Sequence, residues 1–308
     1  MNPITFTPLY KTRVWGGRSL ETIYGRQLPD DQPYGEAWEI VDREDDQSVV
    51  ASGPFEGKSL HELWTSHREE VFGKVPDAPR FPILIKILDC RDDLSIQVHP
   101  PVHLADSLNG EPKTEMWFIA DATPDASLYI GFKEGVTRES FEQSINEGTV
   151  AEAVHKIVPK AGESIFIPSG RCHAIGGGNL IFEIQQNSDT TYRVFDWNRM
   201  GLDGKPRQLH VEESLASIDF NDFEPGMDTP EGNTLAKCDY FHTERFELAP
   251  GEGIGNAGAD RFSLIAVVSG CLTAGGESYQ PGQFVLLPPG SQDLSAGEKS
   301  AVLRITIP

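Results

Sequence analysis

The sequence predicts an all-β protein with minor helices, organised as two β-sandwich or barrel units in tandem. Three observations indicate this fold class: short apolar runs recur along the chain, 30 Gly and 22 Pro are spread between them, and one pattern of Gly and Pro occurs twice. Many short strands separated by turn residues are typical of sandwiches and barrels. The clearest strand-like runs are 81–88, 94–99, 115–119, 164–167, 180–184 and 284–287.

Helices are few, and three segments have the apolar spacing that predicts them: 59–72, 137–147 and 150–157. In the first segment, Ser59 and Glu62 form the pattern of a capping box, in which each side chain binds the backbone of the other residue at the helix start. We expect these three helices to pack outside the β units.

The repeated pattern covers residues 162–173 and 282–293. Each copy begins with Gly, continues through five residues that contain an apolar strand, and reaches Pro-x-Gly. After two more residues each copy presents a polar side chain, His173 in the first and Asp293 in the second. Two unrelated hairpins are the alternative, but the identical spacing favours two related units.

A polar, turn-rich stretch at residues 219–234 separates these two copies. Its Gly and Pro residues are typical of a linker. The sequence therefore predicts an N-terminal unit over residues 1–218 and a C-terminal unit over residues 235–308.

Charge restricts the partners of this chain. The sequence has 26 Lys+Arg against 47 Asp+Glu, a net charge of −21. Such a surface repels nucleic acid and anionic lipid, so we expect neither nucleic acid nor a membrane as a partner. An anionic substrate would need a local cluster of cations.

Targeting and cysteine signals point to the cytoplasm. No apolar run approaches the ~20 residues of a membrane span, and the start of the chain lacks the pattern of a signal peptide. The four cysteines are scattered without a CxxC pair, which favours reduced thiols over a disulfide scaffold. We expect a cytoplasmic monomer or weak homodimer.

Three β segments carry candidate metal ligands. Alternation places Ser95, Gln97 and His99 on one face of their strand, which alone would be the solvent face of an edge strand. Glu115 leads into an apolar strand, and a buried carboxylate needs a cation. His173 follows the Pro-x-Gly turn.

Each histidine alone is more often structural. Together with Glu115 and Gln97 they match the N/O ligand set of an open metal site, for which zinc is the default ion. Mn²⁺, Fe²⁺ or Co²⁺ would accept the same ligands.

Two cations lie in unusual surroundings. Lys86 interrupts a nearly apolar run, where it either extends to a strand end or carries a function. Arg193 follows Tyr192 in a β-like run, and alternation predicts that it shares a face with Phe195 and Trp197. An internal Arg–carboxylate pair is the alternative to a functional role.

Residues 162–173 resemble the second motif of the cupin superfamily, and Gln97, His99 and Glu115 resemble a degenerate first motif. More specifically, the chain is similar to the type I mannose-6-phosphate isomerases (phosphomannose isomerases) in their short bacterial form, over about residues 6–200. The stretches that carry this similarity are 8–17, 35–40, 95–100, 113–115 and 190–197.

The resemblance implies two cupin jelly rolls in tandem and one Zn²⁺ per chain, held by Gln97, His99, Glu115 and His173. It implies reversible interconversion of mannose 6-phosphate and fructose 6-phosphate through an enediolate, with Arg193 as the catalytic arginine. The C-terminal unit would lack the metal ligands.

The remaining site residues are expectations from chemistry. Lys86 and Ser95, with Lys113, would supply charge and donors for the phosphate or the sugar. The general base stays open among Lys113, a metal-bound water and Glu183, and we expect Lys113 to be catalytic and Glu183 to contact substrate. Two other functions are a metal- or sugar-binding bicupin without catalysis and an Fe²⁺-dependent bicupin oxygenase.

Overall fold

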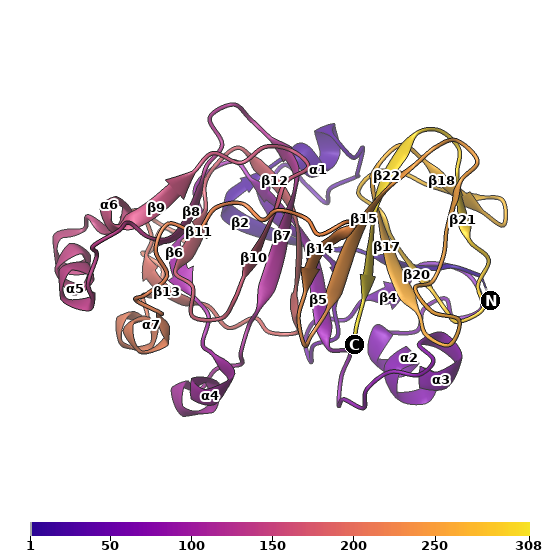
Figure 1. Cartoon of the computed structure of the whole chain (residues 1–308), viewed down its shortest axis with the longest axis horizontal. Helices are drawn as coiled ribbons and strands as arrows, with labels where there is room; N and C mark the ends of the chain where they lie inside the picture. The colour runs from indigo at the N-terminus through magenta and orange to yellow at the C-terminus, as the bar shows by residue number, and fades with distance from the viewer. Residues whose placement is uncertain (1) are drawn as a thin grey trace.

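Strands dominate the computed structural model, which describes residues 2–308 (Figure 1). These residues form four sheets, and all their ladders are antiparallel. The predicted β class is confirmed. No helix within residues 2–308 has the length and apolar character needed to cross a bilayer.

The N-terminal half of the molecule is built on two sheets that face each other (Figure 1). The six-stranded sheet has the order β10 (Ser164–Ile167), β7 (Glu115–Ala122), β12 (Asn179–Gln186), β5 (Ile83–Cys90), β2 (Leu9–Gly17) and β3 (Tyr34–Ile40). The five-stranded sheet has the order β13 (Tyr192–Phe195), β6 (Ile96–Val98), β11 (His173–Ile175), β8 (Leu128–Phe132) and β9 (Val154–Ile157).

The other half contains the remaining two sheets. The seven-stranded sheet has the order β14 (Thr234–Lys237), β15 (His242–Leu248), β22 (Ser300–Thr306), β17 (Ser263–Ser269), β20 (Phe284–Leu287), β1 (Ile4–Thr7) and β4 (Val49–Val50). The four-stranded sheet has the order β16 (Gly253–Ile254), β21 (Leu294–Ala296), β18 (Leu272–Ala274) and β19 (Glu277–Tyr279).

The two halves share a sheet and a core. Strand β1 pairs with β20, so residues from the start of the chain extend the C-terminal sheet. Phe182 of the N-terminal half packs against Phe284, with ring centroids 5.3 Å apart. The division at residues 219–234 stays a prediction, and any such division leaves β1 and β4 in the sheet of the other unit.

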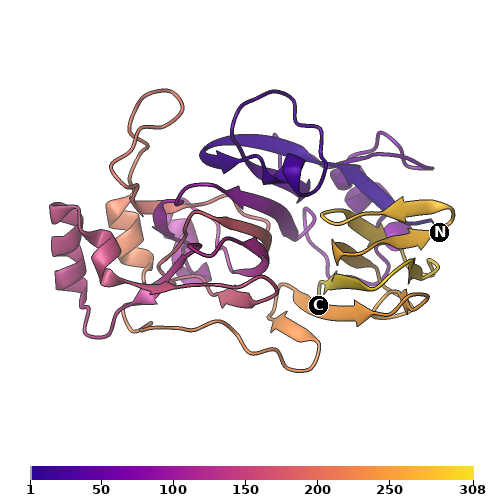
Figure 2. The same ribbon diagram turned by 90° about the horizontal axis from the view of Figure 1, so that it is seen from above.

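The helices are short and lie outside the sheets (Figures 1 and 2). They are α1 (Ser19–Thr22), α2 (Leu60–Ser66), α3 (Arg68–Val71), α4 (Val102–Ala105), η1 (Asp106–Leu108), α5 (Arg138–Glu147), α6 (Val150–Ala153) and α7 (Val211–Ser217). The capping box of Ser59 and Glu62 is confirmed at the start of α2.

Two of the predicted helices differ from the structure. Segment 59–72 breaks at His67, where φ is −129°, and continues as α3. Segment 150–157 is helical only to Ala153, because residues from Val154 onward pair with β8 as β9. Sheet pairing therefore overrides the helical spacing of this segment.

The repeated Gly/Pro pattern has the same conformation in both copies. Strands β10 and β20 begin two residues after Gly162 and Gly282, whose φ angles are 90° and 81°. Gly170 and Gly290 also have positive φ, at 92° and 70°, a conformation that favours glycine. The turns that follow lead into β11 and β21.

Candidate metal centre and active site

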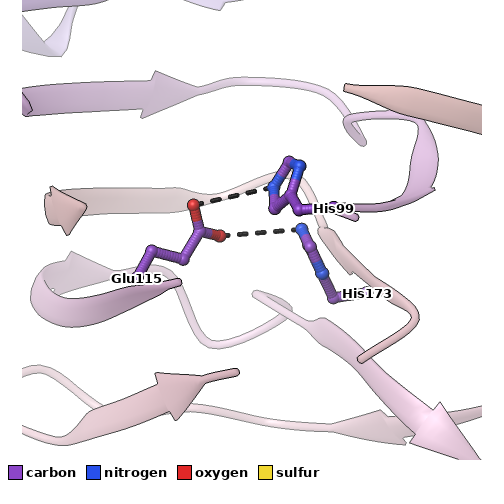
Figure 3. Close-up of side chains that lie close together, drawn as sticks. All are labelled: His99, Glu115 and His173. Atoms are coloured by element: carbon purple, nitrogen blue, oxygen red, sulfur yellow. Dashed lines mark ion pairs between the residues drawn. The ribbon is translucent and has the colours of Figure 1, made fainter. Parts of the chain in front are cut away.

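The metal-ligand candidates come from neighbouring strands of the N-terminal half. Gln97 in β6 lies opposite His173, the first residue of β11. His99 directly follows β6, and Glu115 opens β7 in the facing sheet. Figure 3 shows the Glu115 carboxylate directed at both imidazole rings.

The distances fit one ion between these three side chains. Glu115 Oε2 lies 3.7 Å from His99 Nε2, and Glu115 Oε1 lies 3.6 Å from His173 Nε2. One ligand atom from each residue lies within 4.8 Å of the others. Ligands at ~2.1 Å from a tetrahedral ion are about 3.4 Å apart, so small movements suffice to bring them onto a metal.

The hydrogen bonds around the imidazoles assign their tautomers. His99 Nδ1 is 2.9 Å from the carbonyl oxygen of Thr190, and His173 Nδ1 is 2.8 Å from that of Arg171. A carbonyl only accepts, so each Nδ1 carries the hydrogen and each Nε2 presents a lone pair toward Glu115. This is the arrangement that holds metal-binding histidines in other proteins.

Buried acceptors without donors are the strongest sign of a cation. His99 Nε2 and both Glu115 carboxylate oxygens are fully buried and accept no hydrogen bond within residues 2–308. Lys113 Nζ lies 2.9 Å from Glu115 Oε2, close enough for an ion pair but outside hydrogen-bond geometry. Leaving such atoms unsatisfied is costly, and a metal ion would satisfy them together.

Burial also selects the protonation states. It holds the pKa of His99 well below its usual value, helped by the charge of Lys113, and lowers the pKa of His173 to about 3. Both imidazoles are therefore neutral, the form that binds metals. Burial raises the pKa of Glu115 to about 7, a shift that a bound cation would oppose.

Gln97 lies at the edge of the triad. Its side-chain nitrogen is 3.4 Å from His173 Nε2, and rotation of the amide would place Oε1 there instead. Gln97 also lines a cavity of about 580 Å³ next to the triad, a volume in the range of small-molecule sites. The predicted residues Lys86, Ser95, Lys113, Glu183 and Arg193 all line this cavity.

The two lysines are neutralised by carboxylates. Lys86 Nζ is 3.3 Å from Glu183 Oε2, and Lys113 Nζ is 3.9 Å from Glu183 Oε1. Lys86 is 4% exposed, so it is paired inside the fold and does not extend to a strand end. Burial would raise the pKa of Glu183, but Lys113 and Lys86 lower it overall.

Arg193 has different surroundings. Its Nε donates to Ser95 Oγ over 3.2 Å, and its Nη1 donates to the Gln208 carbonyl over 2.9 Å. Within residues 2–308 no carboxylate lies at ion-pair distance from Arg193, so the internal ion pair is not found. Burial and the nearby charge of Arg207 lower the pKa of Arg193 to about 10.

The predicted face of Arg193 needs a correction. The register shifts between Arg193, which lies opposite Gln97, and Phe195, which lies opposite Ile96. This bulge moves Phe195 to the apolar face, where it joins the core with Tyr192. Arg193 reaches the cavity as predicted, but it does not share a face with Phe195.

Several cavity residues were not found from the sequence. Glu36 accepts hydrogen bonds from Arg13 (2.8 Å) and from the indole of Trp38 (2.6 Å), and despite burial the charges of Lys86 and Arg13 lower its pKa to about 2. The available signal was that Glu36, like Glu39, interrupts the otherwise apolar run Tyr34–Ile40. Arg207 lies in a turn-rich segment without periodicity, so no sequence signal marks it.

Comparisons with known proteins give one consistent match. Residues 4–125 match the family profile described as phosphomannose isomerase type I, catalytic domain. The chain is 38% identical to mannose-6-phosphate isomerase ManA of Bacillus subtilis over 305 residues, covering 94% of this chain and 93% of that protein. It is 34% identical to a mannose-6-phosphate isomerase of Streptococcus mutans, covering 90% of this chain and 89% of that protein.

A solved structure extends the similarity to the whole fold. The crystal structure of the mannose 6-phosphate isomerase from Bacillus subtilis aligns with a TM-score of 0.89 and 31% sequence identity, covering 100% of both chains. A structure from Archaeoglobus fulgidus, at 20% identity and a TM-score of 0.80, shares the fold over 99% of this chain and 97% of that chain.

Proposed function

This chain belongs to the type I mannose-6-phosphate isomerase family, and we propose that it interconverts mannose 6-phosphate and fructose 6-phosphate through an enediolate. The observation that carries this proposal is the buried His₂Glu cluster with unsatisfied acceptor atoms, placed beside a cavity lined by lysines, arginines and carboxylates. It fits an aldose–ketose isomerase, which must stabilise negative charge on oxygen next to a carbonyl carbon.

We propose that one Zn²⁺ per chain is held by His99, Glu115 and His173, with Gln97 as the fourth ligand. The N/O donor set and the absence of cysteine ligands support a catalytic rather than a structural zinc site. A divalent ion there would polarise the sugar carbonyl and stabilise charge on its oxygen.

The buried ion-pair chain suits proton transfer between neighbouring carbons. Isomerisation moves one proton from C2 of the aldose to C1 and one proton from the C2 hydroxyl to the C1 oxygen, so that the carbonyl moves from C1 to C2. Lys113 and Glu183 lie side by side at the cavity and are the protein groups available for this transfer. Lys86 holds Glu183 in its charged form and, with it, contacts the sugar hydroxyl groups.

Arg193 and Ser95 form the second wall of the site. The hydrogen bond from Arg193 Nε to Ser95 Oγ fixes the guanidinium on the cavity side of β13. Because no carboxylate lies at ion-pair distance from Arg193 in the described chain, its charge is available to the substrate and to the enediolate.

A coupled assay for fructose 6-phosphate formed from mannose 6-phosphate tests the function. We expect turnover that a chelator abolishes and that Zn²⁺ restores, with one metal per chain by elemental analysis. Binding of mannose 6-phosphate without turnover would instead indicate a non-catalytic sugar-binding protein. Oxygen consumption with Fe²⁺ would indicate an oxygenase.

For the architecture, we propose tandem jelly rolls, with catalysis in residues 1–218, a linker at 219–234 and no metal in residues 235–308. The repeated Gly/Pro conformation supports this division. Limited proteolysis should cut first within the linker. We place the protein in the cytoplasm as a monomer or weak homodimer, which light scattering after size exclusion would test.

A further inference from the structure

Two arginines share one carboxylate, Asp196, and a third arginine lies near them without a carboxylate partner in the part of the chain that the structure describes. Arg207 binds Asp196 with two hydrogen bonds, Nε to Oδ2 over 2.7 Å and Nη2 to Oδ1 over 2.5 Å. Arg199 Nη2 also donates to Asp196 Oδ1 over 2.9 Å, and Arg193 has no carboxylate partner within residues 2–308. This group therefore has a surplus of two positive charges on a chain whose net charge is −21.

Two of these arginines lie on the cavity wall, and each has a donor nitrogen without a partner in the described chain. Arg193 and Arg207 both line the 580 Å³ cavity, which Arg199 does not. Arg193 Nη2 and Arg207 Nη1 make no hydrogen bond to any described residue. Asp196 pairs with Arg207 as Glu183 and Glu115 pair with the lysines, but Nη1 of Arg207 stays free of every described residue and can donate to a ligand.

Arg207 lies on a loop that is anchored at its ends. At the start, Trp197 Nε1 donates to the Leu94 carbonyl over 2.6 Å, and at the end the His210 amide donates to the Arg193 carbonyl over 2.8 Å. Residues 198–209 project between these anchors as the salmon loop of Figure 2. Its Leu202 is 55% exposed and also lines the cavity.

We propose that Arg207 binds the phosphate group of the substrate and determines specificity for phosphorylated sugars. This inference rests on the proposed function for the identity of the sugar. Phosphate oxygens accept charge-assisted hydrogen bonds, and planar guanidinium groups bind them better than ammonium groups do. Lys86 and Lys113 are then left to the sugar end of the substrate.

Inorganic phosphate is the probe for this site. With the purified, metal-containing protein, calorimetry should show that Arg207→Ala weakens phosphate binding by at least about tenfold, as expected for lost charge-assisted hydrogen bonds. Arg199→Ala is the matched control, since it removes an equal charge from the same carboxylate but not from the cavity wall. It should change the dissociation constant by less than about threefold.

Equal losses of phosphate affinity in Arg207→Ala and Arg199→Ala would show that only the overall charge matters, and would overturn the proposal. Normal phosphate binding by Arg207→Ala would overturn it too, as would the absence of phosphate binding by the unsubstituted protein. Arg207→Lys controls for a change in loop structure, because lysine keeps the positive charge at this position but lacks the planar guanidinium group. It should bind phosphate more tightly than the alanine variant and less tightly than arginine, and any other order would contradict direct contact.

Substrate kinetics separate this proposal from the function itself. In Arg207→Ala, KM for mannose 6-phosphate should rise by at least about tenfold, more than kcat falls. An unchanged KM in an active isomerase would remove Arg207 from the phosphate site and leave the function standing. Phosphate binding that depends on Arg207, in a protein that never isomerises mannose 6-phosphate, would support the site and refute the function.

Discussion

Strand pairs β7–β10 and β17–β20 contain the two copies of the repeated Gly/Pro pattern. Their backbones are alike, but they carry different side chains at equivalent positions. Ile167, five residues after Gly162, lies opposite Glu115, and Leu287, five residues after Gly282, lies opposite Ser263. The first copy thus places a buried carboxylate where the second places a buried hydroxyl that binds the Ala257 amide.

The turns after these strands differ in the same way. His173 is 1% exposed and faces Glu115, whereas Asp293 is exposed and packs beside the backbone of Gly253 and Gly255. The same backbone arrangement therefore carries a cluster of candidate metal ligands in one half and only packed side chains in the other. The candidate metal centre depends on the side chains of the first copy and on the neighbouring strand β7, which supplies the carboxylate.

The largest effect should come from removing a ligand of the first copy. His173→Ala leaves Glu115 and His99 as two buried ligands, so metal affinity should fall by at least about 10²-fold and activity should be lost with it. The same outcome is expected for His99→Ala. Elemental analysis beside the coupled assay checks both, and full metal occupancy in either variant would disprove the ligand assignment.

Arg193 should separate turnover from metal binding within the same half. Guanidinium stays protonated and does not bind cations. Arg193→Ala should therefore keep its metal and its melting temperature while kcat falls by ~10²-fold or more. Lysine should restore only part of the activity, because it lacks the planar fork.

Near-normal kcat in Arg193→Ala would reduce this arginine to a structural role. The measurement is kcat, metal content and melting temperature for the alanine and lysine variants side by side. Loss of metal in the alanine variant would contradict the expected separation.

The pH dependence of metal binding should report on Glu115, the side chain that Ser263 replaces in the second copy. Burial raises the pKa of Glu115 to about 7 and lowers that of His173 to about 3. Below about pH 7 the metal must displace one proton, from Glu115 and not from a histidine. Apparent affinity should therefore fall about tenfold per pH unit as pH drops from about 7 to 5, and level off above 7.

Metal titrations against a competing chelator at several pH values measure this slope. A slope of two protons would show that a histidine also titrates in this range. A flat profile would show that Glu115 is already ionised in the metal-free protein.

The smallest effect should come from the second copy. Asp293 is exposed and belongs to no ligand cluster within residues 2–308. Asp293→Ala should leave metal content and kcat unchanged and alter the free energy of unfolding by no more than about 0.5 kcal/mol. A loss of metal or activity would mean that the two halves cooperate at the site.

Local patterns predicted much of this site. Strand alternation predicted that Gln97 and His99 share one face. The position of Glu115 at the start of an apolar strand predicted that it is buried, and the residue is 0% exposed. The Pro-x-Gly turns were readable because glycine alone adopts positive φ without strain. These features depend on neighbours a few residues apart.

Long-range contacts were not predictable in this way. Lys86 pairs with Glu183 because strands β5 and β12 are neighbours in the sheet. Asp196 pairs with Arg207, which lies at the far end of a loop. The bulge after Arg193 shifts the alternation by one residue, and no residue type marks it in advance.

By itself the sequence determined the β class, the two Gly/Pro turns and the residues able to bind a metal, because backbone conformation and burial pattern follow from local side chains. Only the tertiary structure decided which charges are neutralised and which stay available at the cavity. Coulomb energy depends on distance in space, and the partners of Lys86, Lys113 and Arg207 are set by how the sheets and loops meet.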